Sequence, residues 1–452
     1  MRRRFASPFA FAVAVAVFGL HASGLSAGAD PPPDAPASAS NPALAPLEAL
    51  YPELERLYLD FHQTPELSRH EEKTAAKLAS LLRPLGFKVT EKVGGTGVVG
   101  VLANGAGPTV LIREDMDALP IQERTNLPYA SKVTATDESG ATVHVMHACG
   151  HDVHMTSLIG AATLLSRAKG LWRGTLVVIG QPAEERGSGA KGMLDDGLFT
   201  RFPRPDFAIS LHDSAILPAG KLAWVPGYAN ANVDSVDITV FGRGGHGAYP
   251  HTTIDPVVIA SRIVVSLQTL VARENNPLDP AVVTVGSFHA GTKHNIIPDE
   301  AKLQITVRSY KDEVRKRLLA GIERIAKAEA AAAGAEKAPA VTVSEGTPAM
   351  KNDPALTRRI AGVFEREFGK DNVIQGEPTM GGEDFSEFGR AGIPSLQYNL
   401  GAVEPARYDA SKKNGTPLPS LHSSEFAPNR PITLRLGTAS LTTAALELLG
   451  KP

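Results

Sequence analysis

The chain lacks the cysteines that a disulfide-stabilised fold needs, since Cys149 is the only one in 452 residues. A single cysteine cannot form an internal disulfide. In an oxidising compartment a free thiol is a liability, whereas a bound metal would hold it as a thiolate and limit its reactivity. A lone cysteine is also often a small buried apolar residue, so this residue alone leaves both interpretations open.

The sequence has no strong charge of either sign. It carries 46 Lys and Arg residues against 48 Asp and Glu residues, a formal net charge of −2, without a long basic block. Nucleic acid is therefore not an expected partner. The apolar share of 43% and the charged share of 21% are ordinary for a soluble globular protein, and the length suits about two domains with cores of their own.

Long apolar runs are scarce, and no segment beyond the N-terminus is expected to span a bilayer. Three arginines at residues 2–4 precede the apolar residues 9–20, and residues 27–29 read Ala-Gly-Ala, an A-x-A cleavage site. We expect residues 1–29 to be a signal peptide, with an uncleaved anchor as the alternative. The mature protein would then be periplasmic or secreted. Residues 30–46, rich in Pro, Ala and Ser, predict a disordered tether.

One stretch of ten residues, 146–155, gathers most of the candidate chemistry. It contains three histidines, an aspartate and the only cysteine: His147, Cys149, His151, Asp152 and His154. Residues 141–146 predict a strand and residues 155–168 a helix, so the stretch lies on a strand-to-helix turn, where α/β enzymes place chemistry. Cys149 and His151 are two residues apart and would point to one side of an extended backbone, as half of a metal site. The histidine spacing also fits one polar helix face, although Gly150 argues against a helix there.

Strands and helices alternate along most of the chain. Helices are expected at residues 47–62, 71–85 and 432–449, and strands at 88–93, 97–102, 109–113, 174–180, 207–211 and 395–399. This alternation predicts an α/β domain with a mainly parallel sheet, built from residues 47–228 and 347–452.

Residues 229–346 have a different order of predicted strands and helices. Strands at 233–241, 281–288, 301–310 and 340–345 alternate with helices at 255–272 and 313–333 in the order βαββαβ, the ferredoxin-like pattern. We expect an inserted lid or dimerisation domain. The Gly-rich loop at 242–247 carries His246, either a mobile catalytic residue or part of an ordinary bulged turn.

Acidic and histidine side chains follow the buried strands. Asp115 and Asp117 either ligate metal or orient an imidazole, or they cap a turn. Glu184 and Glu185 are adjacent and face opposite ways, so one can bind metal while the other acts as a general base; a solvated pair that opens a helix is the alternative. His212 is a third ligand candidate at the same sheet edge.

Six short motifs, in this order, resemble the M20 family of metallopeptidases over residues 47–449. The match is to its amidohydrolase branch, which includes hippurate hydrolases, N-acyl-amino-acid amidohydrolases and indole-acetyl-amino-acid hydrolases. The motifs are residues 115–120 (DMDALP), 147–152 (HACGHD), 182–185 (PAEE), 245–251 (GHGAYPH), 295–299 (NIIPD) and 382–385 (GEDF).

The resemblance implies a two-metal hydrolase whose divalent ions are zinc or manganese. Its five ligand positions match Cys149, His151, Glu185, His212 and His422. Cys149 would bridge the two ions, His151 and His212 would complete one site, and Glu185 and His422 the other. Thiolate and imidazole ligands favour zinc, while carboxylate and water positions also suit manganese.

The resemblance also implies roles for three further residues. Glu184 matches the general base, and His246 matches the histidine of the inserted domain that supports the transition-state oxyanion. Asn295 falls in a motif that borders the substrate. Relatives that dimerise borrow this histidine from the partner subunit, so we expect a homodimer.

The expected reaction is hydrolysis of the amide bond of a small N-acyl amino acid to a carboxylic acid and a free amino acid. The alternatives are a dipeptidase or carboxypeptidase of the same fold, and a non-catalytic periplasmic binding protein, which would leave the ligands and the base unexplained. Two departures from the family concern the substrate. Glu114 stands where relatives carry a small residue, and residues 213–216 differ as well, so Glu114 or Asp213 could hold a free α-ammonium group.

Overall fold

A computed structural model describes residues 41–451 of the chain. The predicted signal peptide, residues 1–29, and most of the predicted tether lie outside the described residues. The end of the tether differs from the prediction, because Pro42–Leu44 form a short 3-10 helix, η1, whose Ala43 and Leu44 are buried. Asn41 caps this helix by accepting a hydrogen bond from the Ala43 amide at 3.0 Å. Residues 42–44 are therefore helical and packed, although they lie within the predicted tether.

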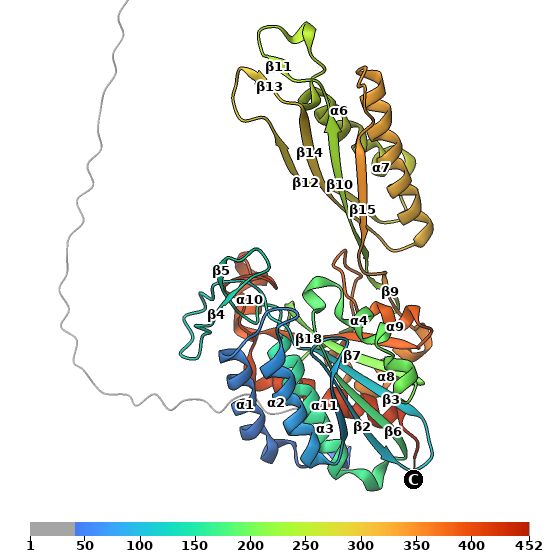
Figure 1. The fold of residues 1–452 in the computed structure, drawn as a ribbon. Helices are drawn as coiled ribbons and strands as arrows, with labels where there is room; N and C mark the ends of the chain where they lie inside the picture. Colours follow the sequence, from blue (N-terminus) through green and yellow to red (C-terminus); the bar gives the residue numbers. More distant parts are fainter. Residues whose placement is uncertain (1–40, 452) are drawn as a thin grey trace, which may run out of the picture. The chain divides into compact units, whose positions relative to one another are not determined.

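An eight-stranded sheet organises the part of the chain that carries the candidate site (Figure 1). Its strands are β1 (Lys88–Val93), β2 (Gly97–Asn104), β3 (Thr109–Asp115), β6 (Gly174–Gln181), β7 (Phe207–Pro218), β8 (Leu222–Trp224), β17 (Val373–Gln375) and β18 (Ser395–Val403). They lie in the order β1-β2-β6-β3-β7-β18-β8-β17. The four central strands β6, β3, β7 and β18 pair in parallel, and β1, β2 and β8 add antiparallel pairs around them. This confirms the predicted α/β class with a mainly parallel sheet.

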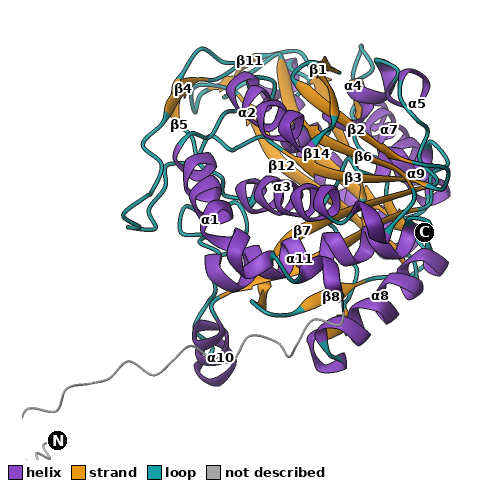
Figure 2. Ribbon diagram, turned by 90° about the horizontal axis from the view of Figure 1, so that it is seen from below, coloured by secondary structure: helices purple, strands orange, loops and turns teal. Residues whose placement is uncertain are grey.

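Helices cover both faces of the sheet. The larger core lies under α1 (Leu47–Gln63), α2 (Glu72–Leu82), α3 (His151–Arg167), α8 (Pro354–Phe368) and α11 (Arg430–Leu448). The smaller core lies under α4 (Gly189–Asp195), α5 (Leu198–Arg201) and α9 (Ser386–Arg390). Neighbouring residues of β3 belong to different cores, Ile112 to the first and Leu111 to the second, because side chains alternate across a strand. Figure 2 shows helices of the larger core lying across the strands.

Helix α3 is the innermost helix of the larger core. Every residue from His151 to Leu165 is buried, because α3 contacts α1 and α11 as well as the strands β3 and β7. This burial explains why its sequence is apolar all round rather than amphipathic. Polar side chains near its N-terminus must therefore find partners inside the protein.

The inserted segment forms its own sheet with the predicted element order βαββαβ. Its strands are β10 (Asn232–Phe241), β12 (Ala281–Ala290), β14 (Glu300–Ser309) and β15 (Ala340–Glu345), and its helices are α6 (Pro256–Thr269) and α7 (Asp312–Ala332). The strands lie in the order β12-β14-β10-β15, all antiparallel. Val236, Ile238 and Val240 alternate inward from β10 and pack with both helices in a separate core.

We expected no segment beyond the N-terminus to be able to span a bilayer. Judged by length and composition alone, this expectation is wrong. Pro256–Glu274, which covers α6 and the π-helical turn η6 (Leu270–Glu274), has a mean hydropathy of 1.4 over an 18-residue window and passes that test within the described residues. Its apolar character has a packing cause, because Ile259, Ile263 and Leu267 are buried in the core of the inserted segment.

The remaining elements are short. They comprise the two-stranded sheets β4 (Thr134–Thr136) with β5 (Thr142–His144), β9 (Gly227–Asn230) with β16 (Met350–Asn352), and β11 (Gly245–His246) with β13 (Ile296–Ile297), the helix α10 (Pro405–Asn414), and the turns η2 (Arg83–Leu85), η3 (Lys169–Leu171), η4 (Glu184–Arg186), η5 (Pro250–Thr252) and η7 (Lys370–Asn372). The strand expected at 141–146 is therefore reduced to β5.

Candidate metal centre

The carboxyl ends of three neighbouring parallel strands bring the candidate residues together. β3 ends at Asp115, β6 ends at Gln181 shortly before Glu184, and β7 carries His212. In an open parallel sheet these ends face one crevice, where ligands bind. The structure corrects one detail: His212 lies inside β7 rather than at its end, because β18 continues to pair with β7 beyond it.

The turn that carries Cys149 is tighter than the sequence predicts. Helix α3 begins at His151 rather than at residue 155, and Gly150 precedes it with φ 83°. A Cβ atom on Gly150 would lie 2.5 Å from a carboxylate oxygen of Asp213, so only glycine fits in this left-handed turn. The extended backbone expected between Cys149 and His151 is therefore wrong, although both side chains still reach the same site.

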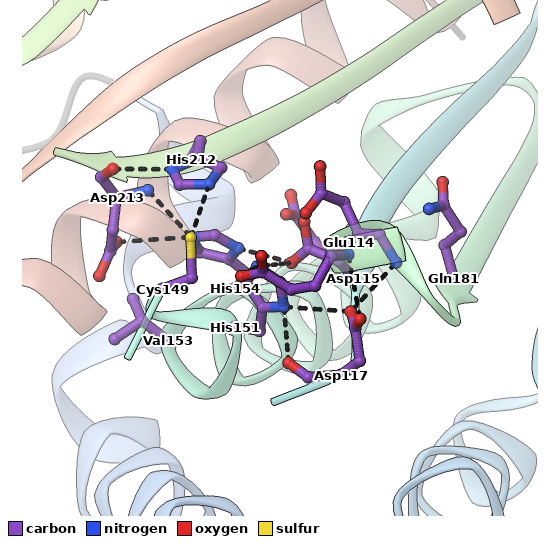
Figure 3. Close-up of polar contacts among 12 residues, drawn as sticks. Glu114, Asp115, Asp117, Cys149, His151, Val153, His154, Gln181, His212 and Asp213 are labelled. Atoms are coloured by element: carbon purple, nitrogen blue, oxygen red, sulfur yellow. Dashed lines mark hydrogen bonds and ion pairs between the residues drawn. The ribbon is translucent and has the colours of Figure 1, made fainter. Parts of the chain in front are cut away.

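All five predicted ligands converge (Figure 3 shows three of them, Cys149, His151 and His212). The Cys149 sulfur lies 3.5 Å from His212 Nε2. Oε1 of Glu185 lies 3.2 Å from His422 Nε2 and 3.9 Å from His151 Nε2. Cys149 completes two groups, one with His151 and His212 and one with Glu185 and His422, and within each group the ligand atoms lie within 4.8 Å of one another. These two groups have the same membership as the two metal sites that the family resemblance implies.

These distances suit ligands that share an ion. A tetrahedral zinc ion holds sulfur at about 2.3 Å and nitrogen at about 2.0 Å, which places the two ligand atoms roughly 3.5 Å apart. The distance of 3.5 Å between Cys149 Sγ and His212 Nε2 matches this value. The donor set of thiolate, imidazole and carboxylate is also one that zinc accepts.

Backbone carbonyls fix which nitrogen of two histidines can ligate. Nδ1–H of His151 donates to the carbonyl of Asp117, and Nδ1–H of His212 donates to the carbonyl of Asp213, each at 2.7 Å. A carbonyl oxygen only accepts, so the proton must be on Nδ1 and the lone pair on Nε2 faces the cluster. This is the arrangement that proteins use to orient metal-bound histidines.

The cluster contains buried polar atoms that make no hydrogen bond. Nε2 of His151 and Oε1 of Glu185 are buried and have no hydrogen-bond partner among the described residues, although Oε1 of Glu185 lies within ion-pair distance of His422. Burial and the neighbouring Glu185 carboxylate raise the pKa of the Cys149 thiol well above its usual range. A bound cation would satisfy both atoms and stabilise the thiolate, so these residues fit a metal.

The fifth ligand arrives from the C-terminal part of the chain. The His422 amide donates to the carbonyl of Ala148 at 2.9 Å, directly beside Cys149. His422 has φ 63°, a left-handed conformation that non-glycine residues adopt rarely. This hydrogen bond therefore holds a strained residue at the position from which its ring reaches Glu185.

Asp117 connects the ligands with the Glu184 turn. Its carbonyl accepts from His151, as described above, while its carboxylate accepts from the amides of Glu184 at 3.2 Å and Glu185 at 3.0 Å. Asp115 has a related position, because it accepts from His154 Nδ1 at 2.7 Å and from Arg113 at 2.8 Å. Both aspartates are buried and orient other groups within the protein, and Asp117 also binds the first two amides of the turn η4.

His246 and Asn295 lie together in the inserted segment. Strand β11, which ends at His246, pairs with β13, and the Gly247 amide donates to the Asn295 carbonyl at 2.9 Å. His246 is exposed; its Nδ1 accepts from the Ala248 amide at 3.1 Å, and its ring packs 5.2 Å from that of Tyr249. The contacts found for His246 within residues 41–451 thus stay within the inserted segment.

The family model of peptidase family M20/M25/M40 matches residues 111–415. The chain belongs to this family. A hippurate hydrolase of Campylobacter jejuni is 40% identical to it over 74% of this chain and 85% of that protein. Thermostable carboxypeptidase 2 of Saccharolobus solfataricus is 36% identical over 86% of this chain and 94% of that protein. The crystal structure of the Bacillus subtilis YXEP protein, a dinuclear metal binding peptidase from the M20 family, is 29% identical and covers 89% of this chain and 100% of its own, with a TM-score of 0.71.

The sequence prediction missed a buried charged network in this M20 chain. Arg113 is fully buried and donates to Asp115, to Glu383 and Asp384 at 3.0 Å each, and to Gln181 at 2.9 Å. An arginine inside an apolar strand was the available signal, because a buried guanidinium requires several acceptors. Its partners could not be identified, since two of them lie about 270 residues further along the chain.

A second buried network ties α1 to the first turn of α3. His62 Nδ1 lies 2.7 Å from Asp152, and its Nε2 lies 3.2 Å from Glu123. Burial alone would lower the pKa of His62, but its hydrogen bonds and charge interactions with the two carboxylates raise it to about 9. His62 is therefore an imidazolium at neutral pH, and both ring nitrogens donate.

The geometry of Cys149 generates a prediction about its reactivity. The metal-loaded M20 protein should resist alkylation by iodoacetamide, and removal of metal with a chelator should accelerate labelling, because a thiolate bound to metal is not free to react. Mass spectrometry of the peptide that contains Cys149 measures the rate, with denatured protein as the control for full labelling. Equal rates with and without chelator would exclude Cys149 as a ligand.

Proposed function

We propose that this M20 protein hydrolyses the amide bond of N-acyl amino acids and releases a carboxylic acid and a free amino acid. The observation that carries this proposal is the convergence of five ligand side chains beside Glu184, the predicted general base. The similarity to a hippurate hydrolase supports the same class of reaction here. The proposed ligands are Cys149, His151, Glu185, His212 and His422, for two divalent ions of zinc or manganese.

The bound ions would supply a polarised scissile carbonyl and a water that gives up its proton near neutral pH. Glu184 accepts that proton as the water oxygen attacks the carbonyl carbon. It then delivers the proton to the amide nitrogen as the carbon–nitrogen bond breaks, so the amino acid leaves as a free amine. One water is consumed, and its atoms are divided between the two products.

The surroundings of Glu184 suit this proton transfer. Burial, together with the charges of Glu383, Glu185 and Asp384, raises its pKa well above the usual range of a glutamate. A base with a raised proton affinity both accepts the proton from water and can return it to the leaving group. The adjacent Glu185 groups with Cys149 and His422, whereas Glu184 lies between the ligand His151 and the acidic pair Glu383 and Asp384.

A carboxypeptidase acting on peptides is the second candidate, favoured by the similarity to thermostable carboxypeptidase 2. Both candidates cleave an amide bond and release a free amino acid. A dipeptidase of the same fold, unlike a carboxypeptidase, would also recognise a free α-ammonium group and would need a carboxylate that faces the substrate. Glu114 and Asp213 are poor candidates for that role, because they are only 0% and 1% exposed and Glu114 accepts from the Leu211 amide at 3.1 Å.

The first prediction for this proposal concerns the substrate. The metal-loaded protein should hydrolyse benzoyl-, acetyl- or other N-acyl amino acids faster than free dipeptides, and chelation should abolish turnover. Amino acid release across a matched panel, in which each acyl amino acid is paired with the dipeptide of the same leaving residue, measures the preference. A preference for peptides would favour the carboxypeptidase alternative, and the absence of any turnover would favour a binding protein.

Two neighbouring substitutions serve as matched controls for the same prediction. Glu184→Gln should retain metal and lose activity by about a hundredfold or more, because the amide cannot accept the proton. Glu185→Ala should lose metal. Metal content is measured by mass spectrometry beside the rate, and an active, metal-loaded Glu184→Gln variant would exclude Glu184 as the base.

We further propose a homodimer in which the inserted segment forms the interface. The outer face of α6 exposes Val258 and Val265, which are 55% and 70% accessible and lie two turns apart. The neighbouring edge strand β12 pairs only with β14 among the described strands. An apolar helix stripe beside an open strand edge suits a self-complementary two-fold contact.

The dimer provides a role for His246. Because this residue is exposed on a loop of the inserted segment, we propose that it donates a hydrogen bond to the developing oxyanion of a site in the partner subunit. Asn295 would border the same substrate, since it lies beside His246 across the β11–β13 pair.

Subunit complementation tests this arrangement. His246→Ala should lower the rate by roughly a hundredfold or more with unchanged metal content, because an oxyanion donor is lost. Mixed with Glu184→Gln, it should form heterodimers that regain part of the activity, because one of their two sites has both residues intact. Unmixed variants are the control, and a fully active monomer in sizing experiments would refute the shared site.

We also propose that the protein is exported, on the basis of the basic, apolar and Ala-x-Ala segments within residues 1–29. The mature chain should begin at Asp30 and be found outside the cytoplasm. Mass spectrometry of its N-terminal peptide tests this, and an intact N-terminus in membranes would instead indicate an uncleaved anchor.

A further inference from the structure

The turn between α1 and α2 brings a buried carboxylate to the Glu184 turn. Glu71 is 0% exposed and lies next to the start of α2. Its Oε1 accepts from the amides of Arg69 and Ala183, each at 2.9 Å, and its Oε2 accepts from the Thr96 hydroxyl at 2.5 Å. One carboxylate therefore connects three segments that are distant in sequence.

Both amides bound by the same oxygen belong to strained residues. Arg69 has φ 69°, and Ala183 has φ 49° and ψ 41°. This left-handed region is unfavourable for residues that carry a Cβ atom, and such residues persist there only when their surroundings hold them. The Oε1 atom of Glu71 supplies a hydrogen bond to each of them.

The conformation of Ala183 determines where the catalytic glutamate begins. Ala183 is the residue immediately before the turn η4, which opens with Glu184 and Glu185. If Ala183 relaxed to an ordinary right-handed conformation, the chain would leave β6 in a different direction, and both glutamates would move. Ala183 also accepts from the amides of Ser188 and Gly189 at 3.2 Å each, so the following residues share this constraint.

The same segment holds the turn from its other side. The Ser68 hydroxyl donates to Asp117 at 2.6 Å, and the Asp117 carboxylate accepts from the amides of Glu184 and Glu185. Glu71 thus fixes the residue before the two glutamates, while Ser68 supports the aspartate that binds their amides.

The partners of Glu71 indicate that it acts as a hydrogen-bond acceptor rather than as half of an ion pair. Among residues 41–451, none of the identified ion pairs includes Glu71, whereas both of its oxygens accept hydrogen bonds. A side chain that reaches the same position and presents a neutral oxygen should therefore replace it. A side chain that keeps the charge but is shorter should not.

We propose that Glu71 is a positioning residue for the reaction: by binding the Ala183 amide it holds the left-handed turn that presents Glu184 to the substrate and Glu185 to the ligand cluster. This role rests on the proposed function, because Glu184 is assigned there as the base. Glu71 itself touches neither the substrate nor the ligand atoms.

Two substitutions of Glu71 separate the effect of side-chain length from the effect of charge. Glu71→Gln keeps the length and an acceptor oxygen for the two amides, so kcat should stay within about threefold of the wild type. Glu71→Asp keeps the charge but is one methylene shorter, so kcat should fall by roughly tenfold to a hundredfold, the size expected when a catalytic group is misplaced by about 1 Å. KM should change much less than kcat. The opposite ranking of the two variants would overturn the proposal.

A glycine substitution tests whether the backbone is the target. Ala183→Gly alone should keep most of the activity, because glycine adopts the left-handed region without steric strain. Combined with Glu71→Asp, it should recover kcat by several-fold. Thr96→Val is the matched control, since it removes only the contact to Oε2 and should leave kcat within about threefold. No recovery in the double variant, or an equal loss in Thr96→Val, would refute the role at Ala183.

A measurement on the metal-loaded protein makes the test independent of turnover. Amide hydrogen exchange of a peptide covering residues 183–185 should accelerate in Glu71→Asp and remain near the wild-type rate in Glu71→Gln. Unchanged exchange in Glu71→Asp would contradict the proposal even if no substrate had been found. Conversely, the wild type could hydrolyse no amide while the two variants still show the predicted difference in exchange. That result would refute the proposed function but would still support the positioning role of Glu71.

Discussion

The metal centre depends on two hydrogen bonds from imidazole to the backbone. Nδ1–H of His151 and Nδ1–H of His212 each donate to a carbonyl, and this places the Nε2 lone pairs in the cluster. The carbonyl that orients His212 belongs to the next residue of β7, Asp213, whereas the carbonyl that orients His151 belongs to Asp117, just beyond β3. A slip of one residue would turn the side chains of a strand to the opposite face of the sheet. The register of the sheet is therefore part of the chemistry of the site.

The surroundings of Glu184 also hold several acidic groups away from water. Glu184, Glu383 and Asp384 approach within 4.8 Å of one another, and Arg113 is the cation that the structure places in direct contact with Glu383 and Asp384. Burial and the neighbouring Glu383 contribute to an increase in the pKa of Asp384 to about 7, although Arg113 acts in the opposite direction. Unbalanced negative charge of this kind favours the binding of protons and cations, which is what an amide hydrolase with a glutamate base requires.

Much of this architecture could be predicted from the sequence, because the relevant patterns are local. The alternation of strands and helices indicated a mainly parallel sheet, and the clustered Cys149 and His151 indicated a metal site. The boundaries of α3 and β7 were less accurate. Gly150 sits in a left-handed turn that ends directly at the helix, and β18, nearly 200 residues later in the chain, extends β7 past His212. Neither effect is visible in a short window of sequence.

The contacts that hold the site in place were not predictable for a related reason. Arg113, Glu71 and His62 each act through partners from distant segments, and only Arg113, inside an apolar strand, had a local signal of burial. The left-handed conformation of Ala183 was hidden as well, since an alanine gives no sign of strain in the sequence. The catalytic role proposed for His246 requires a second subunit.

The partners of Arg113 have a consequence for how the chain folds. Its guanidinium is buried with carboxylates that are 270 and 271 residues away, and the central strand β7 needs β18, which starts at Ser395. Contacts between such distant residues form slowly, because a long loop must close before they contribute any stability. During synthesis, a nascent chain that ends before residue 383 would have to bury Arg113 without two of its anions or leave the sheet open. The native centre can therefore form only after most of the chain has left the ribosome, and until then the apolar strands around it are exposed to aggregation.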